Sequence, residues 1–567
     1  MRKLLYISTV RLSSHNDMNK TSHTLLFGVL LLFLFVRIPG IHASYYQDEF
    51  KNVVASETSL AAASEFFTHP PLTALLLRTD AVIFGGSAMR VLPLLFGILS
   101  VLLLFIVVRR RVDERSALWS AALYAVSFYG VWSSLMVDTD GAILPTLFLA
   151  SVYAYDRLRE NQDRKLFWSG FLVLVLVTGL MVKLSFVLVI GALLGDFLIA
   201  QRQSVHSQQL KVIGVGFIGI GALLATVFFG VSFINPFFQF GGMIAHARAY
   251  MHFADRNYLQ VLVQAVKAVY YLSPLLLAPL VFLSRDLFEK VRVFVVYLAL
   301  GFIFYVILFD FSRGALDKYL MFSIIPLCVL SGVVFSRFLI KPFLLSRAFT
   351  VVGALSASLV IGAAFAPQAV VPLYPKSAWF LSVLHGHLNV LTPFNGGSGP
   401  LGFYVSFLVI FLGYLLSFVV VSIGFFMPRW RQGALIVVLF VGLSYNALFI
   451  EEFSFGKIHG SAPATLAAAL SFIEHSDATK KIITYNDVGA YELSKMGKYV
   501  GRFYAVPQFE VGHEKLFSAY DGQFLVVGIP SLYDGFYSRY FATCAILFQT
   551  QSGVITSTVY TCEKPKK

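Results

Sequence analysis

Residues 91–111 read Val-Leu-Pro-Leu-Leu-Phe-Gly-Ile-Leu-Ser-Val-Leu-Leu-Leu-Phe-Ile-Val-Val-Arg-Arg-Arg, and this stretch decides the class of fold. Its part 91–108 carries no charge and is long enough to cross the hydrocarbon core of a bilayer as a helix. The three arginines that end it are typical of the cytoplasmic border of a membrane span. The stretch therefore predicts a transmembrane helix that runs from the outside to the inside.

The whole chain repeats this pattern. Of its 567 residues 57% are hydrophobic and only 13% are charged, and the mean hydropathy is +0.76. A soluble protein usually carries about 25% charged residues. We predict an all-α polytopic membrane protein with about thirteen transmembrane helices. They lie near 24–41, 91–108, 116–136, 141–156, 166–182, 184–200, 211–232, 268–284, 293–310, 319–336, 348–366, 403–427 and 433–450.

Basic residues gather in every second loop, which predicts the orientation. Clusters of Lys and Arg occur near 2–20, 109–115, 157–165, 202–211, 285–292, 337–347 and 429–431. By the positive-inside rule these loops are cytoplasmic, and so is the N-terminus. An odd number of spans then places the C-terminal region outside, in a cell membrane. The net charge of +14 is explained by these loops and by anionic lipid, so no nucleic-acid partner is expected.

The composition changes near residue 451, and we predict two domains. Residues 1–450 form the transmembrane domain, and residues 451–567 form a small α/β extracytoplasmic domain. Short apolar runs at 481–485 and 524–528 predict buried strands, and 466–475 and 491–496 predict helices. Cys544 and Cys562 flank a strand-rich stretch, and they can pair if that stretch faces an oxidising compartment.

The first outside loop, residues 42–90, contains three candidate site groups. Asp48-Glu49 is a carboxylate pair suited to general-base chemistry, or otherwise a solvated acidic turn. His69 precedes two prolines that fix the entry of a helix. Arg90 lies at the start of a span, where it could bind a phosphate or a carboxylate, or extend to the interface. Two partly apolar stretches, 53–67 and 72–84, predict helices that lie along the interface.

Five further candidates lie at other span ends on the same outside face. Asp138 and Asp140 occupy a short turn between two spans, where acids are costly and usually functional, although Asp140 could simply cap a helix. Lys183 and Lys318, the latter followed by Tyr319, are candidates for binding phosphate. The alternative for both lysines is extension to the lipid interface.

These elements together resemble the GT-C membrane glycosyltransferases, over about residues 24–340. The resemblance is to the dolichyl-phosphate-mannose protein mannosyltransferases and the lipid A aminoarabinose transferases. It rests on Asp48-Glu49, His69-Pro70-Pro71-Leu72, Arg90 with Gly97, Asp140 with Asp138 nearby, Lys183 and Lys318-Tyr319. The acidic turn reads Asp-Thr-Asp, which departs from the family pattern.

The resemblance implies an inverting transfer of a hexose or pentose on the outer face of the membrane. The donor would be a polyprenyl-phosphate sugar, and the acceptor a hydroxyl of a protein, lipid or glycan. Asp48, Glu49 and Asp140 would be the catalytic residues, with Asp48 as the base and Glu49 raising its proton affinity. Arg90, Lys183 or Lys318 would meet the charge of the leaving phosphate. The remaining substrate-binding residues would be His69, Asp138 and Tyr319. No cofactor is required, and a divalent metal is possible but unsupported. The rival functions are transport or flipping of lipid-linked sugars, and a non-catalytic scaffold.

Overall fold

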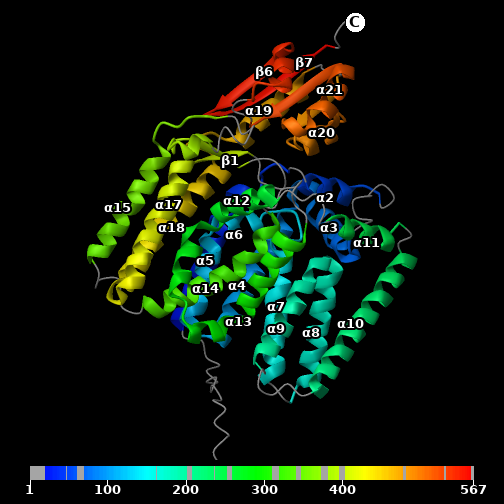
Figure 1. Ribbon diagram of the computed structural model, residues 1–567. Coiled ribbons are helices and arrows are strands. Elements are labelled where there is room, and N and C mark those ends of the chain that lie inside the picture. Colours follow the sequence, from blue (N-terminus) through cyan, green and yellow to red (C-terminus); the bar gives the residue numbers. More distant parts are fainter. Residues whose placement is uncertain are drawn as a thin grey trace, which may run out of the picture.

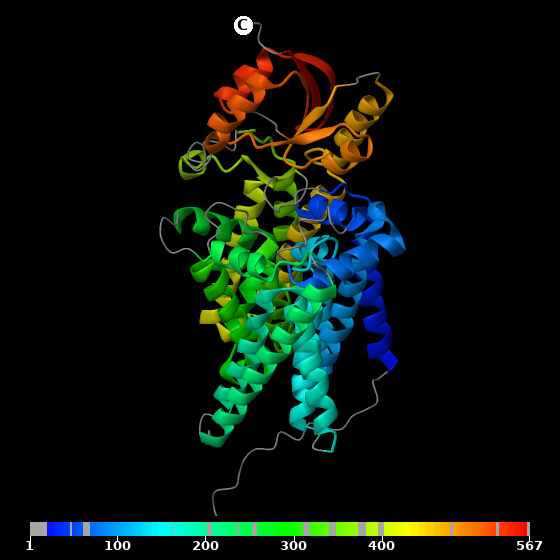
Figure 2. The same cartoon turned by 90° about the vertical axis from the view of Figure 1, so that its right-hand side faces the viewer.

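The computed structural model shows a bundle of long helices with a small mixed sheet stacked on one end (Figures 1 and 2). It describes residues 20–45, 48–59, 69–160, 163–200, 207–234, 237–251, 258–309, 318–339, 347–371, 381–394, 402–476, 480–528 and 532–563. The predicted class, an all-α polytopic membrane protein with a small α/β region at its C-terminal end, is confirmed.

Eight stretches of helix in the described residues are long and apolar enough to cross a membrane. They contain α1 (Lys20–Phe35), α4 (Val91–Arg111), α8 (Lys165–Val182), α13 (Arg285–Phe302), α14 (Ile324–Phe338), α15 (Arg347–Ala364), α17 (Phe407–Phe426) and α18 (Arg431–Ser454). Shorter apolar segments coincide with α9 (Val187–Ala200), α10 (Ser207–Ile234) and α12 (Tyr258–Leu277). All eleven match predicted spans, but the total of about thirteen stays a prediction.

The predicted span 116–136 is interrupted in the structure. It consists of α5 (Glu114–Val126) and the short α6 (Phe128–Ser133), with Ser127 in an extended conformation between them. The side chain of Asn446, from α18, accepts a hydrogen bond from the backbone N–H of Phe128. Arg37 donates to the carbonyl oxygen of Ala125. The broken backbone is thus satisfied by protein groups, as the interior of a membrane requires. The next predicted span corresponds to α7 (Ile143–Glu160).

The centre of the bundle is α14, whose residues Ile324–Ser336 are all buried. It packs along α5, and the two helices lie close together at Gly332. A Cβ atom at Gly332 would lie 2.7 Å from the backbone nitrogen of Ser120. Only glycine permits this contact between the two helices. The core is therefore built around a helix that has no lipid-facing side.

Ion pairs and one backbone contact connect the basic loops to one another. Arg110 pairs with Glu160, and Arg111 pairs with Asp156. Asp196 pairs with both Arg159 and Arg292, and Asp286 pairs with Arg337. Arg115 donates a hydrogen bond to the carbonyl oxygen of Leu339. These contacts bring four of the predicted cytoplasmic clusters, 109–115, 157–165, 285–292 and 337–347, to one end of the bundle. The loops therefore lie on a common face, as their alternation along the chain predicts.

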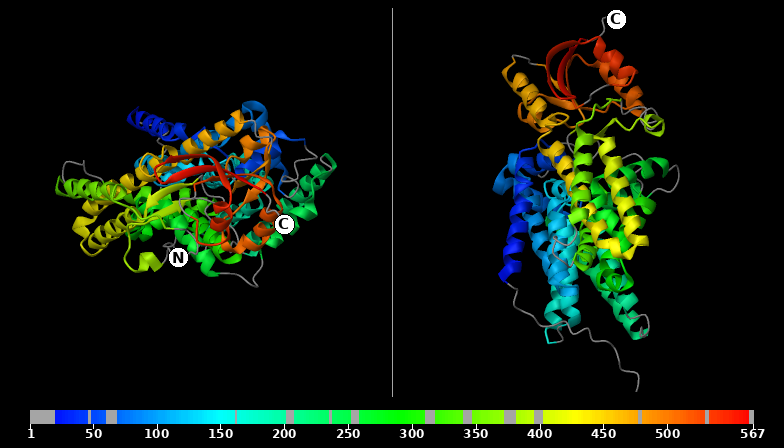
Figure 3. Two further views of the ribbon diagram at one scale, coloured as in Figure 1. Left: turned by 90° about the horizontal axis from the view of Figure 1, so that it is seen from above. Right: turned by 90° about the vertical axis from the view of Figure 1, so that its left-hand side faces the viewer.

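The sheet at the other end has the strand order β4-β3-β5-β7-β6. Strands β3 (Ile482–Tyr485), β4 (Tyr499–Phe503) and β5 (Gly522–Val527) are parallel, and β7 (Ile555–Cys562) runs antiparallel to β5 and β6 (Ala545–Ser552). Helices α19 (Ala462–His475), α20 (Ala490–Lys495), α21 (Glu510–Ala519) and α22 (Phe536–Ala542) accompany it (Figure 3). A separate hairpin of β1 (Leu391–Phe394) and β2 (Phe403–Ser406) precedes α17. Cys544 and Cys562 form a disulfide.

The sheet region rests on α2 (Asp48–Glu57), near α3 (Pro71–Phe84). The ring of Tyr491 packs edge-on against Tyr45, with centroids 5.3 Å apart, and its hydroxyl donates to Glu57 over 3.0 Å. Phe50 and Tyr499 form a second edge-on pair at 5.4 Å. Helix α2 therefore lies between the helical bundle and the C-terminal sheet.

Candidate active site

The beginning of α2 is fixed by a buried ion pair between Glu49 and Arg90. Their side chains are 4% and 2% exposed, and two N–H···O contacts of 2.6 and 2.9 Å join them. The other three N–H bonds of Arg90 go to the carbonyl oxygens of Ala43, Ser44 and Leu135. All five donors of the guanidinium are used, so Arg90 has none left for a phosphate. In this structure Arg90 therefore binds protein oxygens, and its expected contact with the leaving group stays a prediction.

Asp48, the neighbour of Glu49, faces a different partner. The ammonium group of Lys318 lies 2.5 Å from Asp48 Oδ2 and 2.7 Å from Asp138 Oδ2. Lys318 stands at the start of η7 (Lys318–Ser323), which leads into α14. Its side chain is 6% exposed, whereas that of Asp48 is 42% exposed. One lysine thus joins two of the predicted carboxylates, and only Asp48 has broad access to solvent.

The positive charge of Lys318 lowers the pKa of the Asp48 carboxyl below its ordinary value. Lys51 acts in the same direction, while burial and the charge of Asp138 oppose it. The expectation that Glu49 raises the proton affinity of Asp48 is wrong, because Glu49 is directed to Arg90 instead. In this arrangement Asp48 is a weak base.

Asp140 and Lys183 form a second ion pair beside the first. Helix α8 ends at Val182, and Lys183 is extended between it and the short helix η4 (Leu184–Phe186). Thr73, on α3, donates to the carbonyl oxygen of Val182 and so satisfies part of the broken backbone. The break places the Lys183 ammonium group at Asp140, which is buried.

Aromatic side chains surround the two lysines. The ammonium groups of Lys183 and Lys318 each lie 5.1 Å from the ring centroid of Tyr319, a distance suited to cation–π contact. Tyr305 stacks on Tyr319 at 5.8 Å. His69 packs edge-on against His246, and burial together with the charge of Lys183 lowers the pKa of His69 to about 4. His69 is therefore neutral at pH 7.

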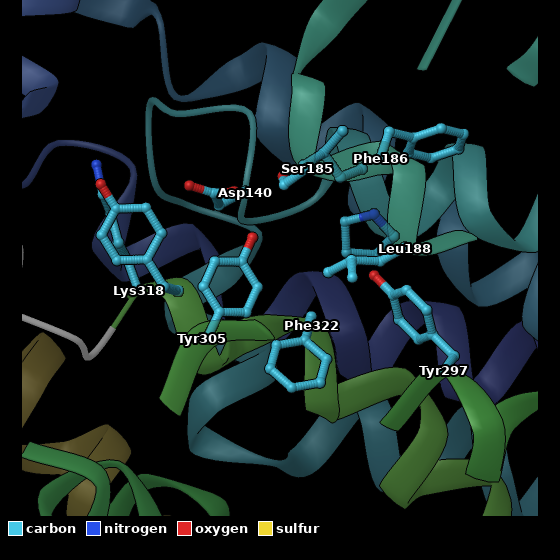
Figure 4. A pocket seen from close by; sticks show the side chains of 11 residues that line it. Asp140, Ser185, Phe186, Leu188, Tyr297, Tyr305, Lys318 and Phe322 are labelled. Carbon is cyan, nitrogen blue, oxygen red and sulfur yellow. The ribbon is translucent and has the colours of Figure 1, made fainter. Parts of the chain in front are cut away.

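A small cavity opens beside this cluster (Figure 4). Asp140 and Lys318 supply its charged lining, together with the hydroxyls of Ser185, Tyr297 and Tyr305. The rest of the wall is apolar or aromatic: Leu144, Pro145, Phe186, Leu188, Tyr319 and Phe322. Asp48 does not line the cavity. Lys318 therefore stands between the cavity and the more exposed carboxylate of Asp48.

The structure thus brings all nine predicted site residues to one region. Asp48, Asp138, Asp140, Lys183, Lys318 and Tyr319 form one contiguous cluster, which we call the carboxylate–lysine cluster. The charges of this cluster act on the pKa of His69. The ion pair between Glu49 and Arg90 holds the start of α2, where Asp48 lies. Within the part of the chain that the structure describes, no three His, Cys, Asp or Glu side chains meet in a way that could hold a metal ion.

Two buried charged groups near this region were missed from the sequence. Arg37 is fully buried and donates to Ser134 Oγ at 2.5 Å, and Asp80 on α3 is 1% exposed. Burial raises the pKa of Asp80 to about 7. The signal in the sequence was a charge next to or within an apolar run, which usually marks a special role in a membrane protein.

Comparison with known proteins identifies similar sequences and folds. Residues 68–229 match the family described as dolichyl-phosphate-mannose-protein mannosyltransferase. No curated protein sequence matches the chain. Two crystal structures of ArnT from Cupriavidus metallidurans share the fold at 12% identity and a TM-score of 0.53. The apo form covers 95% of this chain and 97% of ArnT, and the form bound to undecaprenyl phosphate covers 96% and 98%.

A third structure has a TM-score of 0.43, which is too low to establish a shared fold. It is an oligosaccharyltransferase from Archaeoglobus fulgidus, 12% identical, over 89% of this chain and 69% of that protein. The fold and the candidate site define a multi-pass membrane protein with the GT-C glycosyltransferase fold. More narrowly, residues 68–229 resemble the protein mannosyltransferase family, and the chain as a whole shares the fold of ArnT.

Proposed function

We propose that this protein transfers a hexose or pentose from a polyprenyl-phosphate donor to a hydroxyl group of a protein, lipid or glycan, with inversion. The observation that carries the proposal is the carboxylate–lysine cluster at the edge of the cavity. It brings together the solvent-accessible carboxylate of Asp48, the buried ammonium group of Lys318, the half-buried ammonium group of Lys183 and a largely apolar cavity. A transfer from a lipid phosphate requires each of these parts.

The cavity suits the donor. Its apolar and aromatic wall, which includes Leu188 and Phe322, fits the isoprenoid unit next to the phosphate. Lys318 lines the cavity, and Lys183 pairs with Asp140 of its wall. The two lysines would bind the phosphate and stabilise the negative charge that grows on it as the glycosidic bond breaks. The relative ArnT was crystallised with undecaprenyl phosphate, which supports a donor of this chemical class.

Asp48 is the proposed base. It would take the proton of the acceptor hydroxyl while the oxygen attacks the anomeric carbon from the side opposite to the leaving phosphate. Asp140 and Asp138 would position the lysines, and His69 and Tyr319 would contact the donor. Fixed cations serve a monophosphate leaving group, so we propose that no metal is required. Full activity after treatment with a chelator would agree with this.

We propose that residues 1–450 are the catalytic transmembrane domain and residues 451–567 an extracytoplasmic domain. The basic loops would face the cytoplasm, and the carboxylate–lysine cluster the outer side of the cell membrane. The disulfide between Cys544 and Cys562 supports an oxidising environment for the second domain. Reporter fusions after residue 451 should be active only outside the cytoplasm. Activity inside would overturn the orientation.

Turnover in reconstituted vesicles tests the proposal. The purified protein is incubated with radiolabelled polyprenyl-phosphate sugars and with lipid, glycan and protein fractions as acceptors, and the products are identified by mass spectrometry. We expect a glycosylated product with the wild type. With Asp48→Asn the rate should fall by about a hundredfold to ten-thousandfold, the usual worth of a positioned base. Asp48→Asn with full activity would refute the assignment of the base.

The main alternative is a flippase of lipid-linked sugars, and the same vesicles distinguish it. A flippase would move the labelled donor across the bilayer without cleaving it. Movement of intact donor, with no product in any acceptor fraction, would show that the protein is a transporter and not a transferase.

Glu57→Gln is the matched control for Asp48→Asn, since it makes the same change of charge in α2 at an exposed position away from Lys318.

A further inference from the structure

Lys318 has two incompatible tasks in the proposed reaction. It is expected to bind the donor phosphate, yet in the structure its ammonium group is held by Asp48 and Asp138 at 2.5 and 2.7 Å. Asp48 is expected to act as a base, yet the same contact lowers its pKa. Neither residue is ready for its task while the ion pair between them persists.

The position of Lys318 suggests how the conflict is resolved. Its side chain lines the cavity, and Asp48 lies on the other, more exposed side of it. A phosphate that enters from the cavity reaches the ammonium group from the side that Asp48 does not occupy. The carboxylate of Asp48 is 42% exposed, so it can leave the lysine for water at little cost, whereas Asp138 is buried and cannot.

We propose that Lys318 exchanges its contact with Asp48 for the donor phosphate, so that binding of the donor frees the base. Asp138 acts as a positioning residue that holds Lys318 at the edge of the cavity throughout the exchange. This inference rests on the proposed function and adds an order to it: the donor binds first, and only then can the acceptor hydroxyl lose its proton.

The exchange also protects the donor. Before the phosphate is bound, Asp48 keeps its low proton affinity and activates neither an acceptor nor a water molecule. Once the phosphate neutralises Lys318, the carboxylate regains its ordinary proton affinity and lies at the open side of the sugar. Within the described residues, Lys51, at 4.0 Å from Asp48 Oδ1 and one-third exposed, is a second cation that faces the carboxylate.

The test is equilibrium binding of farnesyl phosphate to the purified full-length protein in detergent. In the wild type, the phosphate must displace Asp48 from Lys318. Asp48→Asn removes the competing charge, so we expect it to bind farnesyl phosphate about tenfold more tightly than the wild type, although it is impaired in transfer. Asp48→Ala is measured beside it, and both variants are first checked for a wild-type melting temperature.

Three controls make the result specific. Glu57→Gln should bind farnesyl phosphate like the wild type. Farnesol, which lacks the phosphate, should bind to the wild type and to Asp48→Asn with equal affinity. In a Lys318→Met background, binding of farnesyl phosphate should be weaker, and Asp48→Asn should no longer tighten it. The last comparison is a double-mutant cycle that measures the coupling of the two residues.

The possible failures are distinguishable. Equal or weaker binding by Asp48→Asn and Asp48→Ala, with weaker binding by Lys318→Met, would overturn the exchange and leave the proposed function intact. Wild-type affinity in Lys318→Met would show that the phosphate does not use this lysine. If the wild type binds farnesyl phosphate no better than farnesol, the lipid-phosphate donor is wrong, and the exchange is wrong with it.

Discussion

Replacing Glu49 by glutamine should destabilise the whole protein, because it breaks a buried ion pair rather than a surface contact. Glu49 and Arg90 are 4% and 2% exposed, and Glu49 also accepts a hydrogen bond of 3.0 Å from the backbone N–H of Val137. Removing one partner of such a pair leaves the other charge buried and uncompensated, at a cost of about 3–5 kcal/mol. Glutamine retains one carbonyl oxygen, so we place the cost near the lower limit, about 3 kcal/mol.

The assay is the apparent melting temperature of the purified protein in detergent. Glu49→Gln and Arg90→Met should each melt several degrees below the wild type. The double variant should recover part of the loss, since it removes both charges together. Glu57→Gln changes an exposed carboxylate of the same helix and keeps an oxygen that can accept the hydrogen bond of Tyr491, so it should melt like the wild type. A wild-type melting temperature for Glu49→Gln would refute the view that this pair anchors α2.

Three further predictions concern other parts of the molecule. Burial raises the pKa of Asp80 from 3.8 to about 7, so the unfolded chain releases this proton first and the wild type loses stability as the pH rises between those values. Asp80→Asn should remove this loss. The difference in melting temperature between Asp80→Asn and the wild type should therefore grow from pH 4 to pH 7, and a difference that does not change with pH would contradict the raised pKa of Asp80. The disulfide should contribute about 3 kcal/mol. Unfolded protein without reductant should therefore titrate one free thiol, that of Cys328, and Cys544→Ser should lower the melting temperature; three free thiols would rule out the bridge. Lys183→Met should insert into the membrane normally but turn over the donor more slowly. The double variant Lys183→Met/Asp140→Asn should melt at a higher temperature than Lys183→Met, because it no longer has an unpaired carboxylate at position 140. Unchanged turnover in Lys183→Met would show that Lys183 does not bind the phosphate.

The sequence predicted the parts of the fold that follow from local periodicity. Apolar runs without charges located the long helices, and short apolar runs located β3 and β5 within one or two residues. The break at Ser127 was missed, because its cause is a side chain of α18 that lies 318 positions further along the chain. Strand β4 was also missed, since its exposed and half-buried residues give no continuous apolar run.

The candidate site was predicted as a set of residues but not as a set of contacts. Charged residues at the outer ends of spans are costly, and this rule alone selected Asp138, Lys183 and Lys318. Which carboxylate meets which lysine depends on how the helices pack. The Asp48–Lys318 pair joins residues 270 positions apart, and neither local spacing nor composition specifies it. The pairing of Glu49 with Arg90 was missed for the same reason, since it joins two residues that are distant in the chain.

The aromatic contacts between α2 and the C-terminal sheet limit how this protein can be recombined. Tyr491 and Tyr499 interlock with Tyr45 and Phe50, and a side chain at Gly86 would collide with Tyr491 and Glu57. A hybrid that receives the sheet of a relative will fit only if it receives the matching α2 surface as well. A chimaeric protein must therefore replace two separate segments of the chain together, residues 45–57 and residues 451–563.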